Sequence, residues 1–353
     1  MATPLIEALH RAWPGATIDL LLKRYLKGLL AGAPWLGREI ILDDGSTFRS
    51  LRRALAKDRY DLGVLLPNSF RPALLLAAAR VRRRIGYRRN GRAVLLTDGL
   101  RFPSERPFRM IDFYGAIGDR LGVPGARGPL RLHATEAEHA SAGELLARHG
   151  LDAAQPIIGV NPGAKYGSSK LWPPTHFAQA ADEIARNAGG GGGVQVALLA
   201  GPGEDDLARD IAARMTAPAI ALPSSEVDLV MLKAVLSHLA LLISNDTGPR
   251  HMAAAFGVPT VTIFGPTHVK WGENEHSRGI DVSIPVECGP CMQRMCPLGH
   301  HRCMTDLSPA MVVEAALRLL DPPSGRPNHG GGGIPLPISV DIGRPAQSAP
   351  AGE

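Results

Sequence analysis

Between residues 155 and 265, short apolar runs alternate with segments long enough to form a helix, and glycine or proline bounds most of them. This alternation is typical of parallel βαβ units, because a strand buried on both faces is continuously apolar and needs a helical crossover to reach its parallel neighbour. We expect strands at Pro156–Val160, Val194–Ala200, Leu239–Ser244 and Val258–Phe264. The pattern predicts an α/β fold with a parallel sheet.

The first half of the chain has a similar organisation. Its predicted strands are Ala16–Leu22, Glu39–Leu42 and Leu62–Leu66, and its predicted helices are Leu51–Lys57 and Ala73–Arg80. The chain opens with one apolar helical face at Thr3–Trp13. A doubly wound domain usually opens with a buried strand instead, so we expect that strand to be missing.

The length of 353 residues and the hydrophobic content of 45% fit two globular domains. We predict an N-terminal domain at 1–140, a C-terminal domain at 155–321 and a disordered tail at 322–353, which is rich in glycine and proline. No apolar run approaches the ~20 residues of a membrane helix, and Met1 is not followed by a signal-peptide pattern. These features predict a cytoplasmic protein.

Charge is distributed unevenly along the chain. Residues 1–130 carry 23 Lys and Arg against 11 Asp and Glu, and the densest basic run is 80–92. This excess indicates an anionic partner such as an acidic glycan or phospholipid headgroups, with a generally arginine-rich proteome as the alternative explanation. No nucleic-acid partner is expected, because Tyr87 is the one aromatic residue interleaved with the basic run.

Three predicted strands of the second half end in polar turns. The carboxyl ends of parallel strands form the ligand-binding edge of an open α/β sheet, and a helix beginning after Thr247 would offer free N–H groups to a phosphate. Lys170 would neutralise a leaving group, whereas the alternative is that Asp246 only caps the helix and His251 only packs. The candidate ligand-binding residues are Ser168, Ser169, Lys170, Glu204, Asp246, Thr247, Gly248 and His251.

Four segments carry a resemblance to a known family: Leu66–Arg71, Asn161–Trp172, Asn245–His251 with Phe264–Thr267, and Cys296–His301. They resemble glycosyltransferase family 9, the bacterial lipopolysaccharide heptosyltransferases, and within it the heptosyltransferase II group. The resemblance implies a GT-B architecture, in which two Rossmann-like domains face each other across a cleft. It also implies inverting transfer of heptose from ADP-L-glycero-D-manno-heptose to heptosyl-Kdo2-lipid A, at the cytoplasmic side of the inner membrane, with no required cofactor.

The same resemblance implies roles for individual residues. Ser168, Ser169 and Lys170 would hold the diphosphate, Glu204 the nucleoside, and the group Asp246, Thr247, Gly248 and His251 the sugar and phosphates. The predicted contacts to the anionic lipid A and Kdo acceptor are Asn68, Ser69, Arg71 and Arg88.

The start of the chain departs from the family pattern. Family members begin with a strand and a Gly-Asp turn before the helix that carries Thr-Pro, and that aspartate is the expected general base. Here the sequence starts Met1-Ala2-Thr3-Pro4, so the base would lie upstream of Met1. A late start codon, a fragment and a diverged protein all fit, and a catalytically impaired sugar-nucleotide-binding or zinc-binding module is the alternative function.

The cysteines form one array, Cys288, Cys291, Cys296 and Cys303. The first pair has the spacing of zinc ligands, and four sulfurs would complete a tetrahedron. The longer spacings differ from the common two-pair ribbon, so we expect reduced core and loop thiols and no metal, with a structural zinc site as the alternative.

Overall fold

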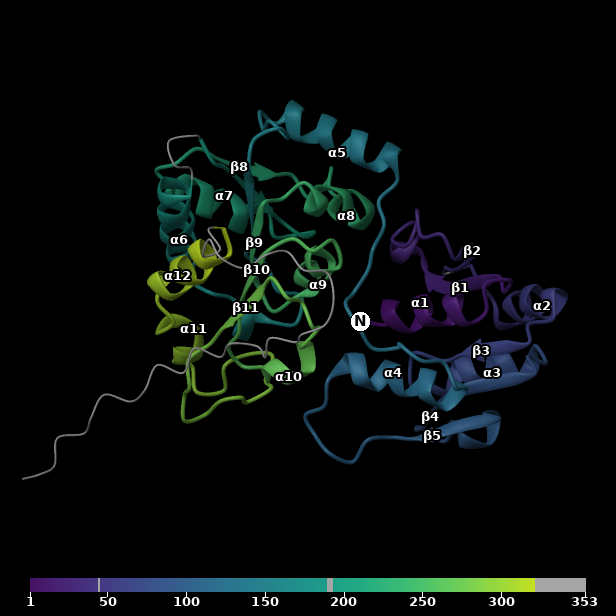
Figure 1. Cartoon of the computed structure of the whole chain (residues 1–353). Coiled ribbons are helices and arrows are strands. Elements are labelled where there is room, and N and C mark those ends of the chain that lie inside the picture. Colours follow the sequence, from purple (N-terminus) through teal and green to yellow (C-terminus); the bar gives the residue numbers. More distant parts are fainter. Residues whose placement is uncertain (44, 189–192, 321–353) are drawn as a thin grey trace, which may run out of the picture.

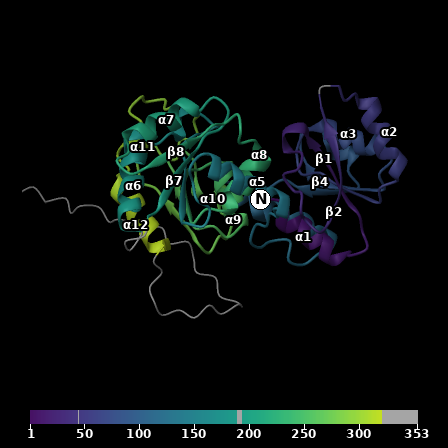
Figure 2. The same ribbon diagram turned by 90° about the horizontal axis from the view of Figure 1, so that it is seen from above.

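The computed structural model describes residues 1–43, 45–188 and 193–320, and the predicted tail at 322–353 lies outside them. The described chain forms two lobes, which lie side by side in both views (Figures 1 and 2). The N-terminal lobe runs from α1 to α4 and the C-terminal lobe from α5 to α12. None of the helices in this described part has the length and apolar character needed to span a bilayer.

The C-terminal lobe contains one parallel sheet of six strands, in the order β11-β10-β9-β6-β7-β8. Counted within the lobe this is the 3-2-1-4-5-6 order of a doubly wound sheet, so the strand order reverses between β6 and β9. The strands are β6 Ile157–Asn161, β7 Gln195–Leu199, β8 Ala219–Leu222, β9 Leu241–Asn245, β10 Thr260–Ile263 and β11 Gly279–Val282. The helices are α5 Glu136–Arg148, α6 Pro174–Asn187, α7 Asp205–Arg214, α8 Leu229–Ser237, α9 Gly248–Ala255, α10 Val269–Gly272, α11 Arg302–Thr305 and α12 Pro309–Leu320.

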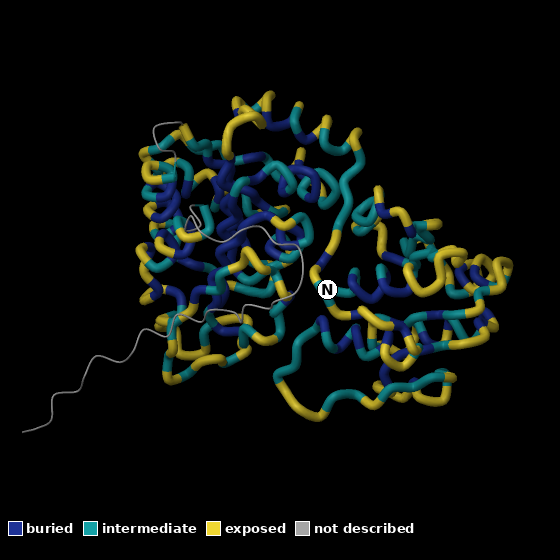
Figure 3. The backbone as a smooth tube through the Cα atoms, viewed as in Figure 1, coloured by how far each residue is buried: buried dark blue, intermediate teal, exposed yellow. Residues whose placement is uncertain are grey.

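Alternate residues of the central strands pack on opposite faces of this sheet. On β6, Ile158 and Val160 join the cluster with α6, α7 and α12, whereas Ile157 joins the cluster with α5, α8 and α9. Buried backbone is accordingly concentrated in the middle of the C-terminal lobe (Figure 3). The four strands predicted here are confirmed to within two residues or so at each end, but β8 and β11 were not predicted.

The N-terminal lobe contains two separate parallel ladders, β1–β2 and β3–β4–β5. The first element is a helix, as expected, and no hydrogen-bonded strand links the two ladders within the described residues. The elements are α1 Thr3–Ala12, β1 Ile18–Lys23, β2 Leu36–Leu42, α2 Phe48–Asp58, β3 Leu62–Val64, α3 Phe70–Ala78, β4 Arg83–Arg88, β5 Asp98–Arg101 and α4 Met110–Leu121.

A fully buried lysine joins the lobes on one side. Lys233 of α8 donates to the carbonyl oxygens of Gly28 and Ala31 in the N-terminal lobe, each at 3.3 Å, and to the Glu138 carboxylate at 2.9 Å. The contact pins the loop that follows β1 to the C-terminal lobe. A buried ammonium is tolerated here because three oxygens satisfy it.

A second set of contacts joins the start of α4 to the α10 region. Arg109 forms an ion pair with Glu275 and lies 3.5 Å from the carboxylate of Glu273. Beside it the rings of Phe108 and Trp271 meet edge to face at a centroid distance of 4.5 Å. Both sets of contacts therefore hold the two lobes together.

Candidate functional site

The loops after β6 and β9 meet where the strand order reverses. Asn161, the last residue of β6, is buried, and its amide donates to Ser244 Oγ at 3.0 Å and to Thr247 Oγ1 at 3.1 Å. The Asn245 amide donates in return to the Pro162 carbonyl at 2.6 Å. This is the position at which open α/β sheets bind ligands, and these bonds fix the two loops relative to each other.

Asp246 is the centre of this arrangement. Lys170 Nζ donates to its carboxylate at 2.5 Å and to its carbonyl oxygen at 2.8 Å, and Thr267 Oγ1 donates at 2.9 Å. Arg250 Nε donates to the other carboxylate oxygen at 2.9 Å. Burial alone would raise the pKa of Asp246, but Arg250 and Lys170 hold it below its ordinary value, so the carboxylate stays ionised.

Helix α9 starts immediately after this carboxylate. Thr247 occupies the N-cap with extended backbone, yet its hydroxyl makes no capping bond to the helix. Pro249 lies in the first turn, and the exposed Gly248 has open space where a Cβ would be. The N–H groups of this turn and the partial positive charge of the helix end are thus available to an anion.

The two serines of the loop before Lys170 differ in exposure. Ser168 is exposed, whereas Ser169 is buried and its hydroxyl donates to the Gln293 carbonyl at 2.6 Å. This bond holds the loop that contains Ser169 against the cysteine-bearing segment, residues 283–301 between β11 and α11. Its predicted contact with a diphosphate stays a prediction, and Ser168 is the more accessible hydroxyl.

Glu204 ties two strand-end loops together. Its carboxylate accepts the N–H of Ala164 at 3.0 Å and the N–H of Gly201 at 2.9 Å. A Cβ at Gly163 would overlap this carboxylate, so only glycine allows the approach. Both carboxylate oxygens already accept backbone bonds, and the predicted contact with a nucleoside stays a prediction.

His251 lies one turn into α9, where the Asn274 amide donates to its Nδ1 at 3.1 Å. Burial lowers the pKa of His251 well below its ordinary value, and the positive charge of Arg250 acts in the same direction. The ring is therefore neutral at physiological pH. With Nδ1 accepting, the neutral ring carries its proton on Nε2 and can donate one hydrogen bond.

The predicted acceptor residues lie on the N-terminal lobe. Ser69 and the exposed Arg71 line a cavity of about 870 Å³ between the ends of β1 and β2 and helix α3. Asn68 lies beside them, and its side-chain oxygen accepts from Arg92 at 3.1 Å. Arg88 is exposed at the end of β4 and is not one of the residues described as lining this cavity.

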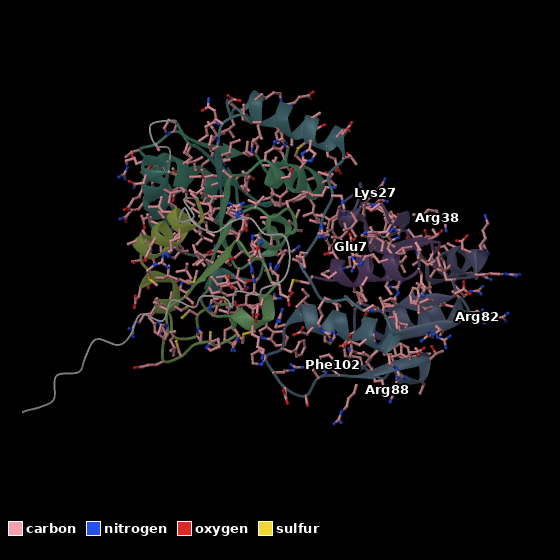
Figure 4. The ribbon with its side chains drawn as sticks, in the orientation of Figure 1. Glu7, Lys27, Arg38, Arg82, Arg88 and Phe102 are labelled. Carbon is pink, nitrogen blue, oxygen red and sulfur yellow. The ribbon has the colours of Figure 1, made fainter. Side chains whose placement is uncertain are left out.

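The cavity has a cationic rim, formed by Lys23 and Arg24 in addition to Arg71. Arg24 is partly neutralised by Asp43 at 2.8 Å. In Figure 4, Arg82, which precedes β4, lies at the outer end of the N-terminal lobe, whereas Phe102, which follows β5, lies nearer the C-terminal lobe. The strands therefore direct their carboxyl ends, and the basic loops after them, toward the C-terminal lobe.

The comparisons with known proteins agree with this geometry. The model of glycosyltransferase family 9 (heptosyltransferase) matches residues 48–302. This chain belongs to glycosyltransferase family 9. The predicted enzyme class, a glycosyltransferase, is thereby confirmed.

Two curated relatives of this family 9 chain are heptosyltransferases. The lipooligosaccharide heptosyltransferase 2 of Campylobacter jejuni (serotype O:2) is 35% identical over 184 residues, which span 50% of this chain and only about half, 53%, of that relative. The lipopolysaccharide heptosyltransferase 2 of Salmonella typhimurium is 25% identical over 336 residues, covering 91% of this chain and 94% of the relative.

The solved structure of Escherichia coli ADP-heptose lipopolysaccharide heptosyltransferase II superimposes with a TM-score of 0.75 at 26% identity, covering 90% of this chain and 94% of that one. The predicted α/β GT-B architecture is confirmed by this match and by the doubly wound C-terminal sheet.

The four cysteines of the family 9 chain are free and partly buried. Within residues 1–43, 45–188 and 193–320, no three His, Cys, Asp or Glu side chains form a group suited to a metal ion. Cys288 Sγ lies 3.9 Å from His300 Nε2. The expectation of reduced thiols without a metal at Cys288, Cys291, Cys296 and Cys303, and the alternative of a structural zinc site, both stay predictions.

Three residues at the site were not given a role from the sequence. Arg250 follows Asp246 by four residues. In a helix this spacing places both side chains on one face, so the sequence alone could have predicted their contact. Thr267 follows the neighbouring strand β10, and its contact depends on the strand order. Arg92 ends the basic run yet is buried, where its guanidinium binds the Tyr87 carbonyl at 2.9 Å and the loop containing Asn68.

Proposed function

We propose that this protein transfers L-glycero-D-manno-heptose from its ADP derivative to the inner core of lipopolysaccharide in a single inverting displacement. Heptosyltransferase 2 relatives that align over most of the chain support this proposal. The observation that carries it is the convergence of Lys170, Asp246 and the open end of α9 at the reversal point of the C-terminal sheet.

Negative charge grows on the diphosphate as the bond to the anomeric carbon breaks. The N–H groups of the first turn of α9 are donors fixed before the reaction, so they stabilise this charge without reorganising, and the exposed Ser168 hydroxyl is a further donor. Lys170 adds a cation beside them. Asp246 is held ionised in the same place and can accept hydrogen bonds from sugar hydroxyls.

The acceptor would bind to the basic loops of the N-terminal lobe. Guanidinium groups bind carboxylates and phosphates in a two-pronged geometry, which suits the Kdo carboxylates and lipid A phosphates of this acceptor. Arg71 at the cavity rim and Arg88 beyond it are the predicted contacts. A glycolipid acceptor would bring the protein to the cytoplasmic face of the inner membrane as a peripheral protein.

The acceptor hydroxyl must also lose its proton to a base. Glu7 of α1 accepts from Trp35 Nε1 at 2.9 Å and lies 3.4 Å from His133 Nε2, so its carboxylate is already engaged in the N-terminal lobe. Figure 4 shows Glu7 on the side of α1 near the C-terminal lobe. No residue of the described chain is assigned as this base.

The test is a transfer assay with ADP-heptose and heptosyl-Kdo2-lipid A, in which released ADP and the mass of the glycolipid are measured. We expect stoichiometric ADP release and a mass increase of one heptose. ADP binding without transfer would favour a sugar-nucleotide-binding module. Failure to bind ADP at all would overturn the proposed donor site.

A further inference from the structure

Among the residues that the structure describes at the proposed donor site, both buried cations are already paired. Lys170 and Arg250 are both buried, and both already donate to the carboxylate of Asp246. One helix N-terminus contributes only about half an elementary charge. The diphosphate of a sugar nucleotide carries more negative charge than that, so a further cation is expected beside the loop that precedes Lys170.

The segment between β11 and α11, which carries three of the cysteines, folds back onto this loop. Tyr166 OH donates to the Met292 carbonyl at 2.7 Å, and the Ser169 N–H donates to the Arg294 carbonyl at 3.1 Å. Together with the bond from the Ser169 hydroxyl to Gln293, these contacts fix three consecutive residues of the segment against the loop. The position of Arg294 relative to the loop is therefore determined by its backbone.

The Arg294 side chain is exposed but not randomly directed. Its guanidinium carbon lies 5.6 Å from the centroid of the Tyr166 ring, and Lys170 Nζ lies 4.9 Å from the same centroid. Arg294 and Lys170 thus both lie against the same aromatic ring. Gly167 lies against the Arg294 backbone, where a Cβ would overlap the carbonyl oxygen.

We propose that Arg294 binds the diphosphate of the donor, as the cation that Lys170 cannot fully supply while it is paired with Asp246. The inference rests on the proposed function. A guanidinium presents two parallel N–H groups to the oxygens of a diphosphate, and the Tyr166 ring holds the guanidinium plane beside the loop. Arg294 has no part in holding the nucleoside.

The test compares ADP with adenosine, because only ADP carries the diphosphate. Calorimetry on Arg294→Gln should show ADP binding weakened by ~10-fold to 100-fold, the range expected for loss of a charge-assisted bond, with adenosine binding unchanged. Arg294→Lys should recover part of the ADP affinity. Arg302→Gln is the matched control, since this exposed arginine pairs with Asp306 at 2.9 Å on α11; it should bind both ligands as the unaltered protein does.

If Arg294→Gln weakened the binding of ADP and adenosine equally, or of neither, the inference about Arg294 would be overturned. The proposed donor would still stand as long as the unaltered protein binds ADP. Tyr166→Leu provides a second check, because it removes the ring and keeps the arginine. It should weaken ADP binding less than Arg294→Gln does and should steepen its dependence on salt, since a less ordered cation acts through longer-range attraction. An unaltered protein that binds no ADP would refute the proposed function itself.

Discussion

Replacing Lys170 with methionine keeps most of the side-chain volume and removes the positive charge from the loop between β6 and α6. The structure shows what is lost: two hydrogen bonds from Nζ to Asp246, at 2.5 and 2.8 Å. Asp246 keeps Arg250 and Thr267 as partners, so it is not left as an unpaired buried charge. We expect the free energy of unfolding to fall by only about 1–3 kcal/mol.

The effect of Lys170→Met on turnover should be larger. A fixed donor to charge that grows in the transition state contributes about 10²-fold to 10³-fold to kcat, whereas contacts to the nucleoside are unaffected. Steady-state kinetics with ADP-heptose and calorimetry with adenosine measure the two separately. Lys57→Met on the exposed surface of α2 is the control and should change neither.

Equal losses in turnover and in adenosine binding would refute a leaving-group role for Lys170 and indicate a collapsed loop. Acid stability gives an independent measurement. The pKa of Asp246 is held down in the folded state, so its contribution to stability is present above the ordinary carboxyl pKa and is lost as pH falls through the folded value. Without Lys170 the folded pKa rises toward the ordinary value, so the pH-dependent loss in melting temperature should be smaller and should be complete at higher pH.

Three further predictions concern residues around this centre. The pKa of His251 is lowered in the folded state, so the unfolded chain binds more protons and stability should decline as pH falls below ~6.5. His251→Gln should flatten this decline when the melting temperature is measured against pH. An unchanged slope would contradict a buried, neutral His251. Lys233→Met leaves Glu138 without its buried partner and should cost about 3–5 kcal/mol in urea unfolding; a cost below ~1 kcal/mol would show that the pair contributes little. Gly167→Ala should displace Arg294 and weaken ADP binding, whereas Gly143→Ala should not, because a Cβ at this half-buried position of α5 meets open space.

The sequence was most informative where local signals and sheet topology agree. The four strands predicted between residues 155 and 265 carry continuous apolar runs, and each is present as a buried strand. β8 and β11 were missed because they are short outer strands whose residues are only partly buried. In the N-terminal lobe, β4 was not predicted because its sequence is rich in arginine. Only Ile85, Gly86 and Tyr87 within this strand are buried.

The candidate site was predictable as a set of loops but not as a set of contacts. Strand ends followed by glycine and polar residues predicted which turns meet, because parallel strands share one carboxyl edge. The sequence did not predict that Ser169 and Glu204 bond to backbone groups, since these partners lie 124 and 40 residues away. Such long-range bonds depend on loop conformation, for which a single sequence carries no periodic signal.

The pairing of Lys170 with Asp246 changes how the donor site should be understood. A lysine that is already neutralised by Asp246 cannot attract a diphosphate as a free cation; it contributes when the substrate competes for it or when charge grows in the transition state. Initial attraction then falls to exposed groups, the α9 N-terminus and the arginine on the cysteine-bearing segment. If exposed groups attract the substrate and the buried Lys170 acts in the chemical step, salt should weaken binding strongly. Salt should affect the chemical step far less, because buried pairs are weakly screened. Measuring KM and kcat between 50 and 300 mM salt therefore tests the division, and a kcat that falls as steeply as the affinity would contradict it.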